Sequence, residues 1–209
     1  MLNAELIGLM KPYVQRGVAD WRDAPAPIRQ RALVCLANKI ADKEHEALEA
    51  IEKFRNGVVL VQPRFIPMPN IQKKETHYFF FLPFGKSDEN GDIRAYFDLV
   101  VLVEDQKCLG FRFEPADLPD RAHGYGHVQL CHSMLGGSIK VPGIPEWLPD
   151  SYPAFSIATS DPLRMFLSMA TAAHGHHGGV TQILKEIFQD RPIAISSYLN
   201  TLKSTLGLP

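Results

Sequence analysis

Two strand-like runs on either side of a turn, residues 108–114 and 127–131, constrain the fold of this chain most strongly. Apolar and polar side chains alternate along both runs, and successive side chains of a strand point to opposite faces of a sheet. The polar members of the two runs are Arg112, Glu114, His127 and Gln129. If the runs pair, their apolar residues must share the core, so we expect these four side chains to form one polar cluster on the other face.

This cluster belongs to a longer β-rich segment, residues 58–132. The run from His77 to Leu82 is almost wholly apolar, as in a strand that is covered on both faces. Residues 93–103 alternate again, with Asp98 among the polar positions. The pattern predicts a meander of four or five antiparallel strands, in which Asp98 comes from a neighbouring strand to the cluster.

Helical patterns precede the β-rich segment, within residues 1–57. We expect a short helix over residues 3–10 that ends before Pro12, because the residue before a proline disfavours helical backbone angles. A long helix is predicted from Ile28 onward, where apolar residues recur at helical spacing. It should end at Gly57, which suits the left-handed conformation that closes many helices.

Helical patterns also end the chain. Residues 133–159 are rich in proline and glycine and are predicted to form a loop, and residues 160–209 are predicted to be helical. Ser160 is the expected N-cap of the first helix in this part, and two shorter helices separated at Pro192 follow it. The whole pattern predicts a single α+β domain: a long N-terminal helix, an antiparallel sheet and C-terminal helices.

Composition limits the classes of partner and compartment. The 209 residues are 45% hydrophobic and carry a formal net charge of −1, so a core can form and no global basic field attracts nucleic acid. RNA or a protein remains a possible partner through a local patch. The chain has no apolar run long enough to span a membrane, and its three cysteines are widely spaced, as in reduced thiols. We therefore expect a cytoplasmic protein without a membrane partner.

The residue types of the polar cluster suit acid–base chemistry. A histidine titrates near neutrality, a carboxylate orients the imidazole or takes a proton, and an arginine binds phosphate. His127, Glu114 and Arg112 therefore suit metal-independent cleavage of a phosphodiester without any cofactor. His123 and Tyr125, on the turn between the two runs, lie close to them in sequence.

A plain alternative is that the cluster is the solvent-exposed polar face of an antiparallel sheet. Under either interpretation the face is predicted to be exposed. Replacing Glu114 or His127 by alanine should then change the free energy of unfolding by no more than about 0.5 kcal/mol.

Two other groups of residues are of types that bind metals or act as nucleophiles. The segment from His174 to His177 is rich in histidine but lacks zinc-site spacing, so we predict no metal site and a structural or surface role. Cys131 lies next to His132, and nearby imidazoles can activate a thiol as a nucleophile. A buried, inert cysteine is the alternative for Cys131.

The sequence Arg112-Phe-Glu114, a histidine-containing turn and His127-Val-Gln129 resemble the pattern of small toxin proteins of the TumE type. In those proteins an Arg-aromatic-acid step precedes paired histidines. The resemblance covers residues 95–130. It implies a ribonuclease-like toxin or defence component.

The order of elements also resembles that of ubiquitin-conjugating (E2-like) domains. An opening helix, a meander, His123 shortly before Cys131 and a later Trp147-Leu-Pro149 carry this resemblance. It implies a carrier protein with Cys131 as a solvent-reachable thioester nucleophile. A non-catalytic binding or accessory protein is the third class that the sequence leaves open.

Overall fold

The computed structural model of the chain describes residues 4–58, 63–70, 77–87, 93–103, 107–116, 125–131, 133–134, 139–140, 154–157, 159–175 and 177–209. The helices are α1 (Ala4–Arg22), α2 (Ala26–Cys35), α3 (Glu44–Arg55), α4 (Pro162–His174), α5 (His177–Ile187) and α6 (Pro192–Thr205). The strands of the main sheet are β1 (Ile66–Pro67), β2 (His77–Ser87), β3 (Ile93–Val103), β4 (Lys107–Glu114), β5 (His127–Leu130) and β8 (Ala154–Ser156). A separate pair consists of β6 (Ser133–Met134) and β7 (Ile139–Lys140).

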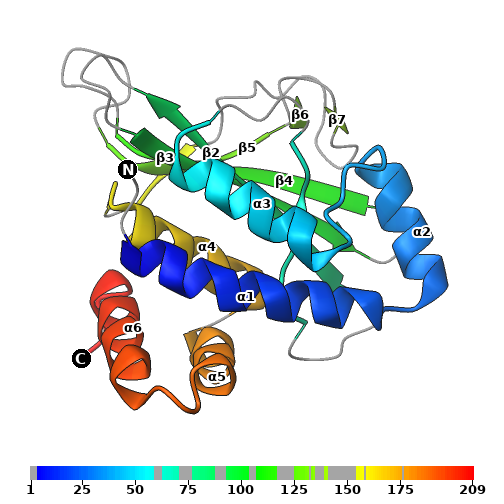
Figure 1. The fold of residues 1–209 in the computed structure, drawn as a ribbon. Helices are drawn as coiled ribbons and strands as arrows, with labels where there is room; N and C mark the ends of the chain where they lie inside the picture. The colour runs from blue at the N-terminus through cyan, green and yellow to red at the C-terminus, as the bar shows by residue number, and fades with distance from the viewer. Residues whose placement is uncertain are drawn as a thin grey trace.

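Within the described residues, the main sheet is antiparallel and has six strands in the order β1-β2-β3-β4-β5-β8. Figure 1 shows this sheet above helices α1 and α4. This arrangement confirms the predicted α+β class, with one or two strands more than predicted. The added strand β8 lies in the segment that was predicted to be a loop. It pairs with β5 through Val128 and Phe155, so a tertiary neighbour and not local sequence makes it a strand.

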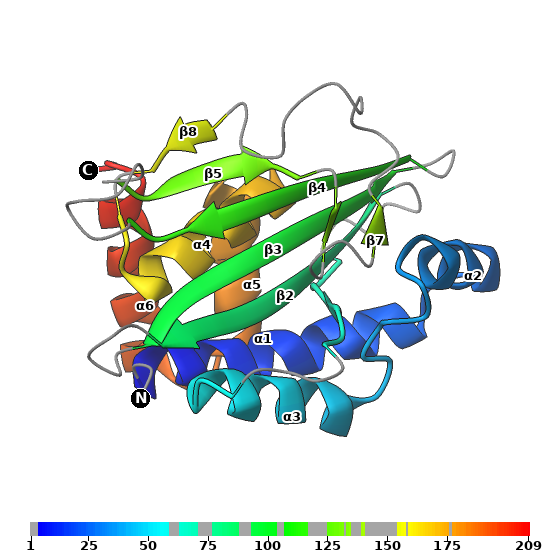
Figure 2. The ribbon, with the colours of Figure 1, turned by 90° about the horizontal axis from the view of Figure 1, so that it is seen from above.

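One face of the sheet packs on helices α1, α3 and α4, which lie behind the sheet or beside it in Figure 2. The apolar cluster on this face joins residues of the strands to residues of these helices, among them Phe81, Phe97, Phe113, Tyr13, Phe54 and Phe166. Burying such side chains contributes roughly 1.5–3 kcal/mol each before entropy is counted. This face is the larger part of the core.

The opposite face carries a second apolar cluster at the end of the sheet near α2. Ile28, Ala32 and Leu36 pack there against strand residues that include Phe80 and Val100. The even-numbered residues of β2 and β3 face this way, and so does the polar cluster. The second face is therefore apolar at one end and polar at the other.

Helix α1 is longer than the sequence pattern predicted, because it continues through Pro12 to Arg22. Proline inside a helix costs about 3 kcal/mol through the lost hydrogen bond and the ring clash. The turns beyond Pro12 bury Tyr13, Val14, Val18 and Trp21, among others. Their burial outweighs the cost, so the prediction of an end before Pro12 was wrong.

The long helix predicted from Ile28 to Gly57 is two helices, α2 and α3. Ala37 and Asn38 between them have left-handed backbone angles, with φ of 50° and 59°. The turn brings Ile40 beside Phe65, and both are buried in the second apolar cluster. Gly57, with φ of 65°, follows the end of α3 as predicted.

The C-terminal helices follow the prediction closely. The N-cap of α4 is Asp161 and not Ser160, since its carboxylate accepts a hydrogen bond of 2.9 Å from the Arg164 backbone N–H. Gly175, with φ of 80°, ends α4, and α5 and α6 are separate helices on either side of a turn before Pro192. Among the described residues, no helix combines the length and apolar character that crossing a membrane requires.

Candidate functional site

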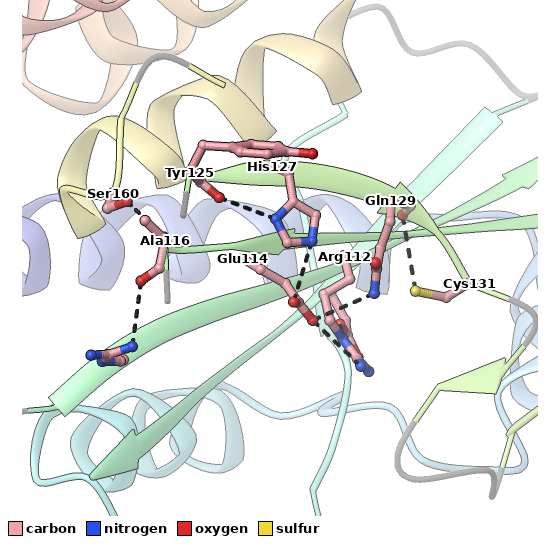
Figure 3. Close-up of polar contacts among 10 residues, drawn as sticks. Arg112, Glu114, Ala116, Tyr125, His127, Gln129, Cys131 and Ser160 are labelled. Atoms are coloured by element: carbon pink, nitrogen blue, oxygen red, sulfur yellow. Dashed lines mark hydrogen bonds and ion pairs between the residues drawn. The ribbon is translucent and has the colours of Figure 1, made fainter. Parts of the chain in front are cut away.

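The strand register brings the predicted polar residues together on one face. Arg112 lies opposite Gln129, and Glu114 lies opposite His127, in the pairing of β4 with β5. Asp98 lies opposite Arg112 in the pairing of β3 with β4. The prediction of a shared face is confirmed, and Figure 3 shows the side chains of β4 and β5 pointing toward one another.

Arg112 is fixed by a buried carboxylate. Its Nε donates to Asp98 Oδ1 at 2.6 Å and its Nη2 donates to Asp98 Oδ2 at 3.1 Å. Burial raises the pKa of Asp98, and it outweighs the opposing effect of Arg112. Burial also acts to lower the pKa of Arg112, but the hydrogen bonds and charge of Asp98 prevail and raise it. The guanidinium is therefore positively charged and held in one orientation.

Glu114 connects the other three side chains (Figure 3). One carboxylate oxygen, Oε1, lies 3.9 Å from Arg112 Nη1 and accepts a long hydrogen bond of 3.5 Å from Gln129 Nε2. The other, Oε2, lies 3.4 Å from His127 Nε2. Its side chain is 20% exposed, so solvent or a ligand reaches the carboxylate.

The two ring nitrogens of His127 each lie near an oxygen atom. Nδ1 lies 3.3 Å from the carbonyl oxygen of Tyr125, and Nε2 faces the Glu114 carboxylate. A carbonyl oxygen has no proton to give, so Nδ1 must carry one. The imidazole is therefore oriented by one backbone carbonyl and lies beside the Glu114 carboxylate.

Burial distinguishes this cluster from the exposed polar face that the alternation predicted. Asp98 and His127 are each 1% exposed and Gln129 is 9% exposed. The exposure prediction was wrong because the same face continues into the second apolar cluster, which local alternation does not reveal. Buried polar groups persist where they have partners, and their removal costs more than a surface change. We therefore expect alanine at His127 to destabilise the protein by more than about 0.5 kcal/mol.

Cys131 is placed at the end of β5 and is 2% exposed. Its Sγ donates a weak hydrogen bond of 3.9 Å to the carbonyl oxygen of Gln129. The solvent-reachable thiol that the E2-like resemblance implies is therefore not found, and the buried alternative holds. His123 lies outside the described residues.

The histidine-rich segment lies apart from the cluster. His174, at the end of α4, is buried and lies 2.7 Å from the hydroxyl of Tyr13 in α1. Within the ranges that the structure describes, no group of three or more histidine, cysteine, aspartate or glutamate side chains is arranged to hold a metal ion.

Sequence reasoning missed an aromatic pair beside the cluster. The rings of Phe84 and Tyr96 stack with centroids 5.1 Å apart, and the Arg112 guanidinium lies 5.4 Å from the centre of the Phe84 ring. The predicted strand ended at Leu82 because Pro83 follows, whereas β2 continues to Ser87. Proline fits there because, among the described residues, β1 pairs with β2 only at Phe80 and Phe81, so the missing N–H of Pro83 is not needed for that pairing. The aromatic Phe84 directly after Pro83 was the available signal.

Comparisons with protein-family models, with curated proteins and with solved structures found no match to this chain.

Proposed function

We propose that this protein is a ribonuclease-like enzyme, of the toxin or defence class, that cleaves RNA without a metal or other cofactor. The observation that carries the proposal is the contact of one partly exposed carboxylate, Glu114, with both Arg112 and His127. Phosphate binding and proton transfer are then available within one cluster. The TumE-type resemblance of residues 95–130 points to the same class.

Arg112 is the group that binds the scissile phosphate. The Asp98 carboxylate accepts hydrogen bonds from Nε and Nη2 of Arg112. Nη1 lies on the side of Glu114. The side chain is 24% exposed. A guanidinium that is already oriented loses little conformational freedom when it binds an anion, and its planar shape matches two phosphate oxygens.

Glu114 accepts the proton in this reaction, and His127 positions Glu114. The Glu114 carboxylate accepts the proton of the ribose 2′-hydroxyl as that oxygen attacks phosphorus. The bond from phosphorus to the departing ribose oxygen breaks, and water supplies the proton that this oxygen takes up. The hydroxide that remains takes the proton from Glu114, which restores the carboxylate. The products are a cyclic phosphate and a free hydroxyl. The buried His127 is a positioning residue that lies against the Glu114 carboxylate and limits its movement.

Tyr125 is the group that contacts a base. Its side chain is 48% exposed, and its ring centre lies 5.9 Å from that of His127 in an edge arrangement. Exposed aromatic rings near cationic groups stack the unpaired bases of RNA. Gln129, at 9% exposure, is instead part of the support of Glu114.

A second candidate is a non-catalytic binding or accessory protein. The near-complete burial of His127 favours it, because a buried imidazole does not touch a substrate. In that case Arg112 and Tyr125 bind a ligand and Glu114 only completes the polar network. The burial of Cys131 gives no comparable support to an E2-like carrier.

The test measures cleavage of an end-labelled single-stranded RNA by the purified chain and by Glu114→Gln, Arg112→Lys and His127→Gln. Glu49→Gln is the matched control, since it removes the same charge from an exposed carboxylate of α3 that pairs with Lys53. We expect Glu114→Gln to lose about 10²–10⁴-fold in rate, as for a general base. The control should keep the wild-type rate, and a chelator should leave it unchanged.

Three results would count against the enzyme. Wild-type protein that binds RNA but leaves it intact would support the binding protein. Equal activity in Glu114→Gln and the wild type would indicate a contaminating nuclease. Loss of activity in chelator would contradict a site that uses arginine in place of a cation.

A further inference from the structure

The sheet face beside the cluster carries two further cations, on the strands β2 and β3. Lys86 lies directly opposite Arg94, and the stacked rings of Phe84 and Tyr96 form the next cross-strand pair. Tyr96 and Asp98 alternate on β3, so all four side chains lie on the same face as Asp98. This face is the one turned toward the viewer in Figure 2.

The aromatic pair connects these cations to Arg112. Lys86 Nζ lies 4.8 Å from the centre of the Tyr96 ring, and Arg112 lies over Phe84. A cation over an aromatic face is attracted by the ring quadrupole. Lys86 is exposed and Tyr96 is buried. The aromatic rings therefore lie beneath the cationic groups, which are nearer the surface.

The pairing of Lys86 with Arg94 is unfavourable for the sheet by itself. Like charges directly opposite one another across two strands repel and lower stability. Arg94 Nη1 donates a long hydrogen bond of 3.4 Å to the Ala116 carbonyl oxygen, at the end of the strand that carries Glu114. Arg94 is thus tied to the neighbourhood of the site.

We propose that Lys86 and Arg94 bind the phosphate backbone of a single-stranded RNA that extends across β3 and β2 from the phosphate held by Arg112. The inference rests on the proposed function for its choice of RNA. Three cations on adjacent strands, with exposed Tyr125 on the other side of Arg112, form the combination of backbone contacts and base stacking that single strands use. The overall charge of −1 makes this a local surface and not a general basic field.

The test measures binding of a fluorescent single-stranded RNA by anisotropy, in a Glu114→Gln background that prevents cleavage. The variant Lys86→Gln/Arg94→Gln is compared with Lys185→Gln/Arg191→Gln, which removes the same two charges from exposed positions in and beside α5. We expect the first pair to weaken binding about tenfold or more at low salt, and to reduce the slope of log K against log salt by about 1.4. The control pair should leave both quantities unchanged.

The charge-preserving variant Lys86→Arg/Arg94→Lys should restore binding, and thermal melts of all variants establish that each is folded. Equal binding by the two charge-removing variants would overturn the inference, as would equal competition by polyglutamate, which would indicate an acidic protein partner. The wild-type protein could bind RNA through Lys86 and Arg94 and yet leave it uncleaved. That result would contradict the proposed ribonuclease activity and support the proposed RNA-binding surface. No RNA binding at all would overturn the surface.

Discussion

His174 is a titratable side chain that is buried in apolar surroundings. Its ring lies between Tyr13 and Phe79, with centroid distances of 6.2 Å and 6.1 Å, and it is 8% exposed. Burial lowers its pKa to about 4, because the apolar surroundings disfavour the charged imidazole. The neutral ring keeps its hydrogen bond with the Tyr13 hydroxyl.

This burial predicts a pH dependence of stability. The imidazole titrates near 6.5 in the unfolded chain, so between about pH 6.5 and pH 4 the unfolded state binds more protons than the folded state. Stability from this group is full above pH 6.5 and falls as the pH drops. Between pH 7 and pH 4.5 the wild type should lose on the order of 2–3 kcal/mol more than His174→Gln, measured by urea unfolding. Parallel losses in both proteins would contradict the buried neutral imidazole.

The cysteines provide a second test at the level of single residues. Cys108 and Cys131 are 3% and 2% exposed, and burial raises the pKa of Cys108 to about 12. Cys35 is only partly buried. Iodoacetamide should therefore modify Cys35 first in the native protein, as read by mass spectrometry of peptides, because a thiol must be both accessible and ionised to react. Fastest modification of Cys131 would restore the E2-like carrier.

Among the elements, helix α1 depends on a close approach to β1. A Cβ atom at Gly17 would collide with the carbonyl oxygen of Pro67. Gly17 is buried, and α1 contacts the sheet edge there. Only glycine lets the two backbones come this close, so the position of α1 against the sheet depends on one residue without a side chain.

We predict that Gly17→Ala destabilises the protein although alanine favours helices by about 1 kcal/mol over glycine. Overpacking typically costs 1–3 kcal/mol, and backbone atoms do not move aside as a flexible side chain does, so a net loss of about 1 kcal/mol or more is expected. Gly8→Ala in the same helix is the control, since its Cβ would meet only the Tyr198 hydroxyl at 3.3 Å. Urea unfolding that shows the same change for both variants would show that the approach to Pro67 can relax.

At the scale of the whole molecule, two apolar clusters share one sheet. Phe80 and Phe81 are neighbours on β2, both fully buried, and they belong to the clusters on opposite faces. Because strand β2 contributes to both apolar clusters, unfolding of one cluster removes part of the packing of the other. The arrangement favours one cooperative unit, as the single-domain prediction requires.

We predict one unfolding transition in which both faces are lost together. Phe80→Ala and Phe81→Ala should each lower the free energy of unfolding by about 3–5 kcal/mol, as for other large buried aromatic residues. In a Trp147→Phe background, the fluorescence of Trp21 reports the cluster near α2, whereas circular dichroism reports mainly the helices of the other face. The two signals should coincide in urea. Separate midpoints would indicate two independently stable parts.

The sequence by itself determined the features that depend on neighbouring residues. Strict alternation in β4 and β5 placed Arg112, Glu114, His127 and Gln129 on one face, because a one-residue shift would have turned the apolar residues to the wrong side. The helix end at Gly57 followed from the left-handed backbone that glycine accepts. These are local rules of backbone geometry, and they need no knowledge of distant contacts.

Tertiary structure alone decided which residues cover each face of the sheet. It also decided where tertiary packing overrides the local sequence preference for helix or strand. Pro12 remains inside α1 because the turns after it are buried, and α2 separates from α3 because Ile40 packs beside Phe65. The burial of Asp98 and His127 likewise depends on residues far away in the chain. Burial sums contacts from every part of the fold, so alternation predicts the face on which a side chain lies but not whether water reaches it.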